Sequence, residues 1–115
     1  MDLKAAVEAL GALAQPSRLE VFRLLVRRGP QGLAAGDISE KVGVPPTTLS
    51  FHLAQLSHAG LLTSRREGRS ILYAADYGGM QKLMGFLVEN CCQDGTGACA
   101  PPASPGRVAR GRRSR

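Results

Sequence analysis

The chain has 115 residues, of which 43% are hydrophobic, 21% are charged and none is Trp. This length and composition predict one globular domain with a modest core. No apolar run approaches the roughly eighteen residues that a membrane span needs, and an odd number of cysteines, three, argues against a disulfide framework. The N-terminal stretch MDLKAAVEALGALA lacks the basic start of a signal peptide, so we expect a reducing, cytoplasmic environment.

The net charge of +6 is concentrated at the C-terminus. The last nine residues, RVARGRRSR, contain five arginines and no acid, whereas the rest of the chain has ten basic residues against nine acids. We therefore expect one domain over residues 1–92 and a flexible tail over residues 93–115. The tail can attract polyanions without specificity, but a solvated segment that only keeps the protein soluble explains its composition equally well.

Apolar periodicity predicts four helices in the first half of the chain. Apolar residues recur at steps of three or four from Leu3 to Leu13, which indicates an amphipathic helix. A second helix follows between Pro16 and Gly29. A short helix within GDISEKVGV and a longer one within PPTTLSFHLAQLSHAG are joined by a few residues that include a glycine. Two helices with such a link predict a helix-turn-helix.

After the helix-turn-helix, apolar residues alternate with a period of two, which is typical of β-strands. The stretch LLTSRREGRSILYAA predicts a β-hairpin with a two-residue turn at Glu67-Gly68, and its tip is rich in arginine. A last amphipathic helix follows in GGMQKLMGFLVENCC, and Cys91 lies on the extension of its apolar stripe. The element order predicts a mainly α fold with a β-hairpin wing, that is, a winged helix-turn-helix.

The first and last helices have more apolar surface than a small core is expected to cover. Pairing both helices between two subunits would bury it in a dimer with two-fold symmetry. A monomer that folds both helices onto its own core is the alternative.

Three stretches, PSRLEVFRLL, GDISEKVGVPPTTLSFHLAQLSHAGLL and REGRSILY, resemble the ArsR/SmtB family of winged-helix metalloregulators. The resemblance covers roughly residues 10 to 90. It implies a dimeric transcriptional repressor that a metal or metalloid releases from its operator. No nucleophile with a base and no phosphate-binding loop points to an enzyme. A DNA-binding protein without an inducer is the rival interpretation.

The second helix of a helix-turn-helix places its N-terminal residues near the base edges of the major groove. The hydroxyl groups there can hydrogen-bond bases or phosphates, and Phe51 can contact a thymine methyl group. The candidate DNA-contacting residues are Thr47, Thr48, Ser50, Phe51 and His52 in this helix and Arg65, Arg66 and Arg69 in the wing. Helix-start chemistry is the alternative for the two threonines, and a plain surface histidine is the alternative for His52.

All three cysteines lie in the stretch ENCCQDGTGAC, at the end of the last helix and just beyond it. Other ligand positions of the family hold no ligands here, because residues 33–37 contain no cysteine and the last helix contains no histidine. The remaining set, Cys91, Cys92 and Cys99, resembles that of the arsenic-responsive members, which implies As(III) as inducer.

Three thiolates suit this inducer because As(III) forms a three-coordinate pyramid, whereas tetrahedral zinc needs a fourth ligand. Adjacent side chains in a regular helix point about 100° apart, so we expect the helix to unwind at the cysteine pair. Sb(III) fits the same geometry, and Cd or Pb is conceivable. A redox switch, in which one of the pair forms a disulfide with Cys99, uses the same thiols.

Overall fold

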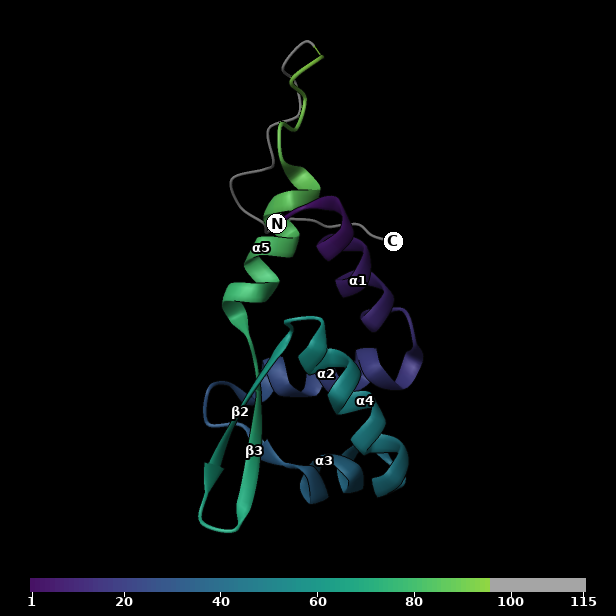
Figure 1. Cartoon of the computed structure of the whole chain (residues 1–115), viewed down its shortest axis with the longest axis vertical. Helices are drawn as coiled ribbons and strands as arrows, with labels where there is room; N and C mark the ends of the chain where they lie inside the picture. Colours follow the sequence, from purple (N-terminus) through teal and green to yellow (C-terminus); the bar gives the residue numbers. More distant parts are fainter. Residues whose placement is uncertain (96–115) are drawn as a thin grey trace, which may run out of the picture.

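The computed structural model describes residues 1–95, which form five helices and a small three-stranded sheet (Figure 1). This is the predicted mainly α architecture with a wing. The elements are α1 Leu3–Leu13, α2 Pro16–Arg28, β1 Leu33–Ala34, α3 Ala35–Val42, α4 Pro46–His58, β2 Leu62–Glu67, β3 Ser70–Ala75 and α5 Tyr77–Val88. No helix in this part of the chain has the length and apolarity that a membrane crossing requires.

Local sequence signals account for most helix boundaries. The side chain of Asp2 accepts a hydrogen bond from the Ala5 amide at the start of α1, and Asp76 does the same for Gly79 at the start of α5. Helix α2 begins at Pro16, which needs no amide partner in the first turn. Helix α3 ends at Val42 and is capped by Gly43 in the left-handed conformation, which glycine adopts at little cost.

The core lies between α2, α3 and α4, and α1, α5 and the base of the wing cover it. Its largest fully buried side chains are Leu25, Ile38, Leu49, Leu56, Leu61 and Val21. The helix-turn-helix, α3 and α4, therefore packs on α2 as one unit. Because one side of α4 is buried in the core, its opposite side is held facing solvent.

The wing is an antiparallel hairpin whose register differs by one residue from the prediction. Glu67 pairs with Ser70, so the turn residues are Gly68 and Arg69 rather than Glu67 and Gly68. Gly68 has φ of 63° at the first turn position, where a type II′ hairpin requires glycine. Strand β1, which was not predicted, has two residues, pairs with β3 and gives the strand order β1-β3-β2.

Helix α1 packs on the domain through alanines rather than through its large aliphatic residues. Ala6, Ala9 and Ala12 are buried, whereas Leu3 and Val7 are 69% and 59% exposed. Small side chains let α1 approach α2, α4 and α5 closely. The aliphatic residues of the predicted stripe, such as Leu3 and Val7, therefore lie largely on the surface of the single chain.

Helix α5 has a similar division. Leu83 is buried against the core. Met84, Leu87 and Val88 are 58%, 55% and 64% exposed. We call these three residues together with Leu3, Val7 and Leu10 the apolar stripe of α1 and α5.

Gly79 provides a test of how α5 joins the domain. A Cβ atom at this position would overlap the carbonyl oxygen of Gly60, a backbone atom that cannot rotate away. Gly79→Ala should lower the free energy of unfolding by about 1–3 kcal/mol, the usual cost of overpacking. Gly36→Ala is the matched control, because a Cβ there meets no atom within 4 Å, and it should cause no loss. Urea unfolding followed by circular dichroism measures both, and equal stability of the two variants would contradict the packing described.

Candidate nucleic-acid interface and cysteine site

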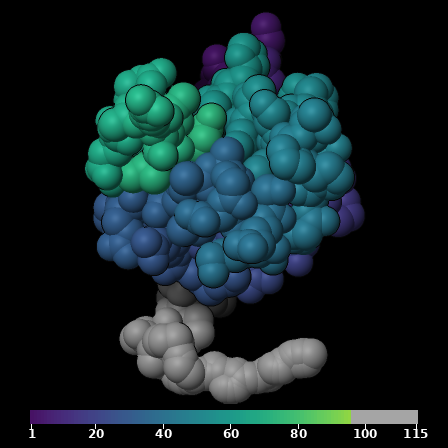
Figure 2. Space-filling view, turned by 90° about the horizontal axis from the view of Figure 1, so that it is seen from below, coloured from purple at the N-terminus to yellow at the C-terminus, as the bar shows by residue number. Residues whose placement is uncertain are grey.

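Helix α4 exposes one polar and aromatic side and buries the other. Leu49, Leu53 and Leu56 anchor it in the core. The predicted contact residues Thr47, Thr48, Ser50 and Phe51 are exposed in its first half. Phe51 is 57% exposed, so its ring is accessible for an apolar contact such as one with a thymine methyl group. Seen from the end of the molecule that carries the wing tip, the helix-turn-helix and the wing lie together on one face (Figure 2).

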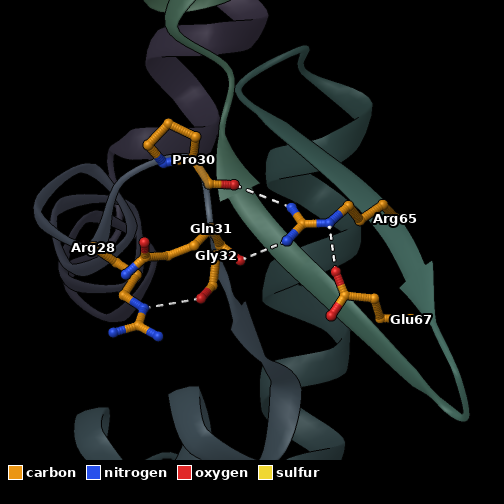
Figure 3. A network of polar contacts seen from close by, with 6 residues as sticks. All are labelled: Arg28, Pro30, Gln31, Gly32, Arg65 and Glu67. Carbon is orange, nitrogen blue, oxygen red and sulfur yellow. Dashed lines mark hydrogen bonds and ion pairs between the residues drawn. The ribbon is translucent and has the colours of Figure 1, made fainter.

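The three wing arginines are not equivalent. Arg66 and Arg69 are exposed near the turn. Arg65 instead directs its guanidinium group toward the connection between α2 and β1 (Figure 3). Its Nη1 donates to the carbonyl of Pro30 at 3.0 Å, its Nη2 to that of Gln31 at 2.9 Å, and its Nε lies 3.2 Å from Glu67 Oε2.

His52 lies inside the fold, so the prediction that it contacts DNA is wrong for this structure. Its side chain is 6% exposed, and its Nδ1 lies 3.4 Å from Nη1 of Arg18 on α2. Arg18 also donates from Nε to the carbonyl of Ala12 at 2.7 Å, which connects the end of α1 to the same place. A sequence signal for this burial existed, because His52 falls on the stripe formed by Leu49 and Leu56 at helical spacing.

The environment of His52 favours its neutral form. Burial lowers its pKa below the ordinary value of 6.5, and the nearby Arg18 guanidinium lowers that pKa further. The folded protein therefore binds fewer protons than the unfolded chain at mildly acidic pH.

The chain leaves helical geometry directly before the cysteine pair, as predicted. Helix α5 ends at Val88, and residues 89–94 form successive turns in which Asn90 and Cys92 have φ of 60° and 62°. The Cys91 amide donates to the Val88 carbonyl at 3.0 Å, which holds the pair against the last helical turn. The left-handed conformation is uncommon for residues other than glycine.

This backbone brings the two thiols together. The Sγ atoms of Cys91 and Cys92 lie 3.6 Å apart, well beyond the S–S bond length of about 2.05 Å. Cys91 is exposed and Cys92 is half-buried. Cys99, the third predicted ligand, lies outside the described residues. Within residues 1–95 no group of three or more His, Cys, Asp or Glu side chains is placed to hold a metal ion.

Comparison with known proteins supports the interpretation of the fold. A helix-turn-helix domain family matches residues 13–65. The nodulation protein NolR of Rhizobium meliloti is 33% identical over 86 residues, covering 75% of this chain and 68% of that protein. A homodimeric winged helix-turn-helix DNA-binding domain from Mycobacterium bovis, described as a possible ArsR-family transcriptional regulator, is 30% identical, with a TM-score of 0.60 over 75% of this chain and 78% of that one. The chain belongs to the ArsR/SmtB family of winged-helix transcriptional regulators.

A third neighbour is the crystal structure of a possible transcriptional regulator for arsenical resistance. It is 27% identical, with a TM-score of 0.60, and the match covers 70% of this chain and 80% of that chain. The present ArsR/SmtB protein is thus a DNA-binding transcriptional regulator. The second helix of a helix-turn-helix enters the major groove, so the exposed side of α4, with the wing beside it, remains the predicted DNA-facing surface.

Arg66 and Arg69 should contact phosphates, because both are exposed on the wing near its turn. We expect Arg66→Gln and Arg69→Gln each to weaken binding across all DNA sequences and to reduce the slope of log K against log salt by about 0.9 per lost contact. Fluorescence anisotropy at several salt concentrations measures the slope, and thermal melting checks that the variants remain folded. Unchanged slopes in both variants would place the wing away from DNA.

His52 should make the stability of the regulator depend on pH. Because its pKa is lowered in the folded state, its contribution is fully present above about pH 6.5 and is lost as the pH falls below that value. Urea midpoints at pH 7.5 and 5.5 should differ more for the wild type than for His52→Gln. His58→Gln, at an exposed histidine of the same helix, should keep the wild-type difference. Identical pH responses of the wild type and His52→Gln would refute this role.

Proposed function

We propose that this ArsR/SmtB regulator is an As(III)-responsive repressor, which binds its operator as a dimer and is released when Cys91, Cys92 and Cys99 capture arsenite. The observation that carries the proposal is the pair of sulfurs 3.6 Å apart directly after α5. The similarity to a possible regulator for arsenical resistance supports the same inducer.

The spacing of the pair suits one thiophilic centre. With metal–sulfur bonds of about 2.3 Å, two thiolates on one atom lie roughly 3.5–3.8 Å apart at pyramidal or tetrahedral angles. Thiolates also prefer soft centres to hard cations. Arsenous acid exchanges its three hydroxyl groups for three sulfurs, and the three thiol protons leave with them as three water molecules.

Cys99 would complete the pyramid from the same chain. It follows Cys92 by seven residues, and a segment of that length spans at most about 24 Å. Gly95 and Gly97 between them permit a reversal of the chain. A short connection keeps the effective concentration of the third thiol high.

The apolar stripe of α1 and α5 supports the dimer. Leu3, Val7 and Leu10 on α1 and Met84, Leu87 and Val88 on α5 leave a large aliphatic surface in water, and exposed patches of this kind commonly mark protein interfaces. Helices α1 and α5 are also in contact with each other. A two-fold dimer would present two α4 helices to half-sites about 34 Å apart.

The same helix then carries both the dimer surface and the thiols. Val88 on the apolar stripe accepts the hydrogen bond of the Cys91 amide. At its other end α5 follows β3 directly, and Tyr77 donates from its hydroxyl group to the carbonyl of Val26 on α2 at 2.9 Å. A change in the last turn of α5 can therefore alter the dimer contact and, through α2 and the wing, the spacing of the two DNA-binding surfaces.

The proposal predicts a thiol-dependent loss of operator binding. An operator duplex is first obtained by in vitro selection with the full chain, and its binding is measured by anisotropy in the presence of a reductant. Arsenite should raise the Kd of the wild type by roughly 5–150-fold, the usual range of allosteric coupling. Cys91→Ser, Cys92→Ser and Cys99→Ser should bind the operator normally and lose this response.

Other outcomes distinguish the alternatives. If Cys91→Ser, Cys92→Ser and Cys99→Ser all still dissociate from the operator on arsenite, the sensor assignment is wrong. A response to a thiol oxidant, but not to arsenite, would identify a redox switch. Titration with Sb(III), Cd and Pb under the same conditions determines which thiophilic ions share the site.

A further inference from the structure

Three consecutive backbone carbonyls of the α2–β1 connection accept hydrogen bonds from two arginines. Arg65 on β2 donates to Pro30 and Gln31, and Arg28 at the end of α2 donates from Nε to Gly32 at 3.0 Å (Figure 3). The connection is therefore held from one side by the helix that precedes it and from the other side by the wing.

This connection leads directly into the helix-turn-helix. Gly32 is followed by β1 and then by α3, which begins at Ala35 without an intervening loop. Gly32 has φ of 71°, and a Cβ atom there would lie 2.6 Å from the carbonyl oxygen of Tyr73 on β3. The backbone is thus packed tightly against the wing strand at the point where Arg65 reaches across from β2.

The energetics suggest a role in geometry more than in stability. Arg65 is 46% exposed, and Pro30 and Gln31 lie on the surface, so water can replace the guanidinium group at both carbonyls. Exposed bonds and ion pairs of this kind contribute little to the free energy of unfolding. The planar guanidinium fork nevertheless fixes the orientation of β2 relative to the α2–β1 connection. Three of its five N–H donors are engaged within the protein.

We infer that Arg65 is a positioning residue that sets the angle between the wing and the helix-turn-helix, and that it does not act as a phosphate contact. Glu67 orients its guanidinium group through Nε. Specific binding requires α4 and the wing to meet the duplex at the same time. The inference stands on the DNA-binding activity of the family and is independent of the arsenite proposal.

Arg65→Lys tests the inference because it keeps the positive charge and removes the fork. If the released wing occupies the binding orientation about a tenth of the time, the Kd for the selected operator rises about tenfold. Binding to a scrambled duplex should hardly change, since the charge remains. In the DNA-free protein, hydrogen exchange of wing amides over residues 62–75 should become faster. Arg66→Gln is the contrast, because it should reduce the salt slope and leave wing exchange unchanged.

Two results would overturn the inference. One is an operator affinity of Arg65→Lys equal to that of the wild type, since the positive charge alone would then explain the contribution of Arg65 to binding. The other is wild-type wing exchange in both Arg65→Lys and Arg65→Gln, because Arg65 would then not hold the wing in place. Circular dichroism and thermal melting confirm that each variant is folded at the assay temperature.

Glu67→Ala provides a second, independent test that does not alter the arginine. Removing an acid from the wing should strengthen binding to every duplex equally if only net charge matters. If Glu67 holds Arg65 in place, the ratio of specific to non-specific affinity should fall instead. An unchanged ratio would contradict the positioning role.

Discussion

The apolar stripe of α1 and α5 is the constraint on which the proposed mechanism depends. Helix α1 packs on the domain through its own alanines, and α5 packs through one side that includes the buried Leu83. Aliphatic side chains on the other sides of these helices, such as Leu3, Val7 and Val88, therefore remain in water. Burying one such side chain is worth roughly 1.5–3 kcal/mol. In the proposed dimer a second copy of the chain would cover this surface, and the position of α5 would then determine how the two α4 helices are spaced.

The cysteine pair directly follows the part of α5 that carries the apolar stripe. The thiols follow the last exposed residue of the stripe by three and four positions, in a segment that has already left helical geometry. Binding three sulfurs to one atom requires this segment to adopt a closed conformation. In the proposed mechanism the free energy of arsenite binding would therefore act on the end of α5, next to the dimer contact, rather than on the DNA-facing surface of α4.

Much of the fold followed from sequence because helical and strand periods are local. The stripes of α2 and α4, the glycine after α3 and the alternation in the wing predicted their elements correctly. Strand β1 was missed because two residues show no period, and it exists only through its pairing with β3. The predicted hairpin register was wrong by one residue, because the sequence pattern allows a glycine at either position of a two-residue turn. In the structure Gly68 occupies the first position, where φ must be positive.

The candidate site was predicted unevenly for the same reason. Exposure of Thr47, Thr48 and Phe51 follows from the helical phase of α4, and that phase also places His52 in the core. Counting arginines in the wing could not separate Arg65 from Arg66, because the partners of Arg65 lie about 35 residues away, as backbone carbonyls that no sequence pattern reveals.

The most direct test of the central claim is arsenic X-ray absorption on the fully reduced, full-length protein with one equivalent of arsenite. We expect an arsenic atom bound by three sulfurs in the wild type and by fewer sulfurs in Cys99→Ser. Arsenic that remains bound only by oxygen, or the same three-sulfur shell after Cys91 and Cys92 are both replaced by serine, would contradict it.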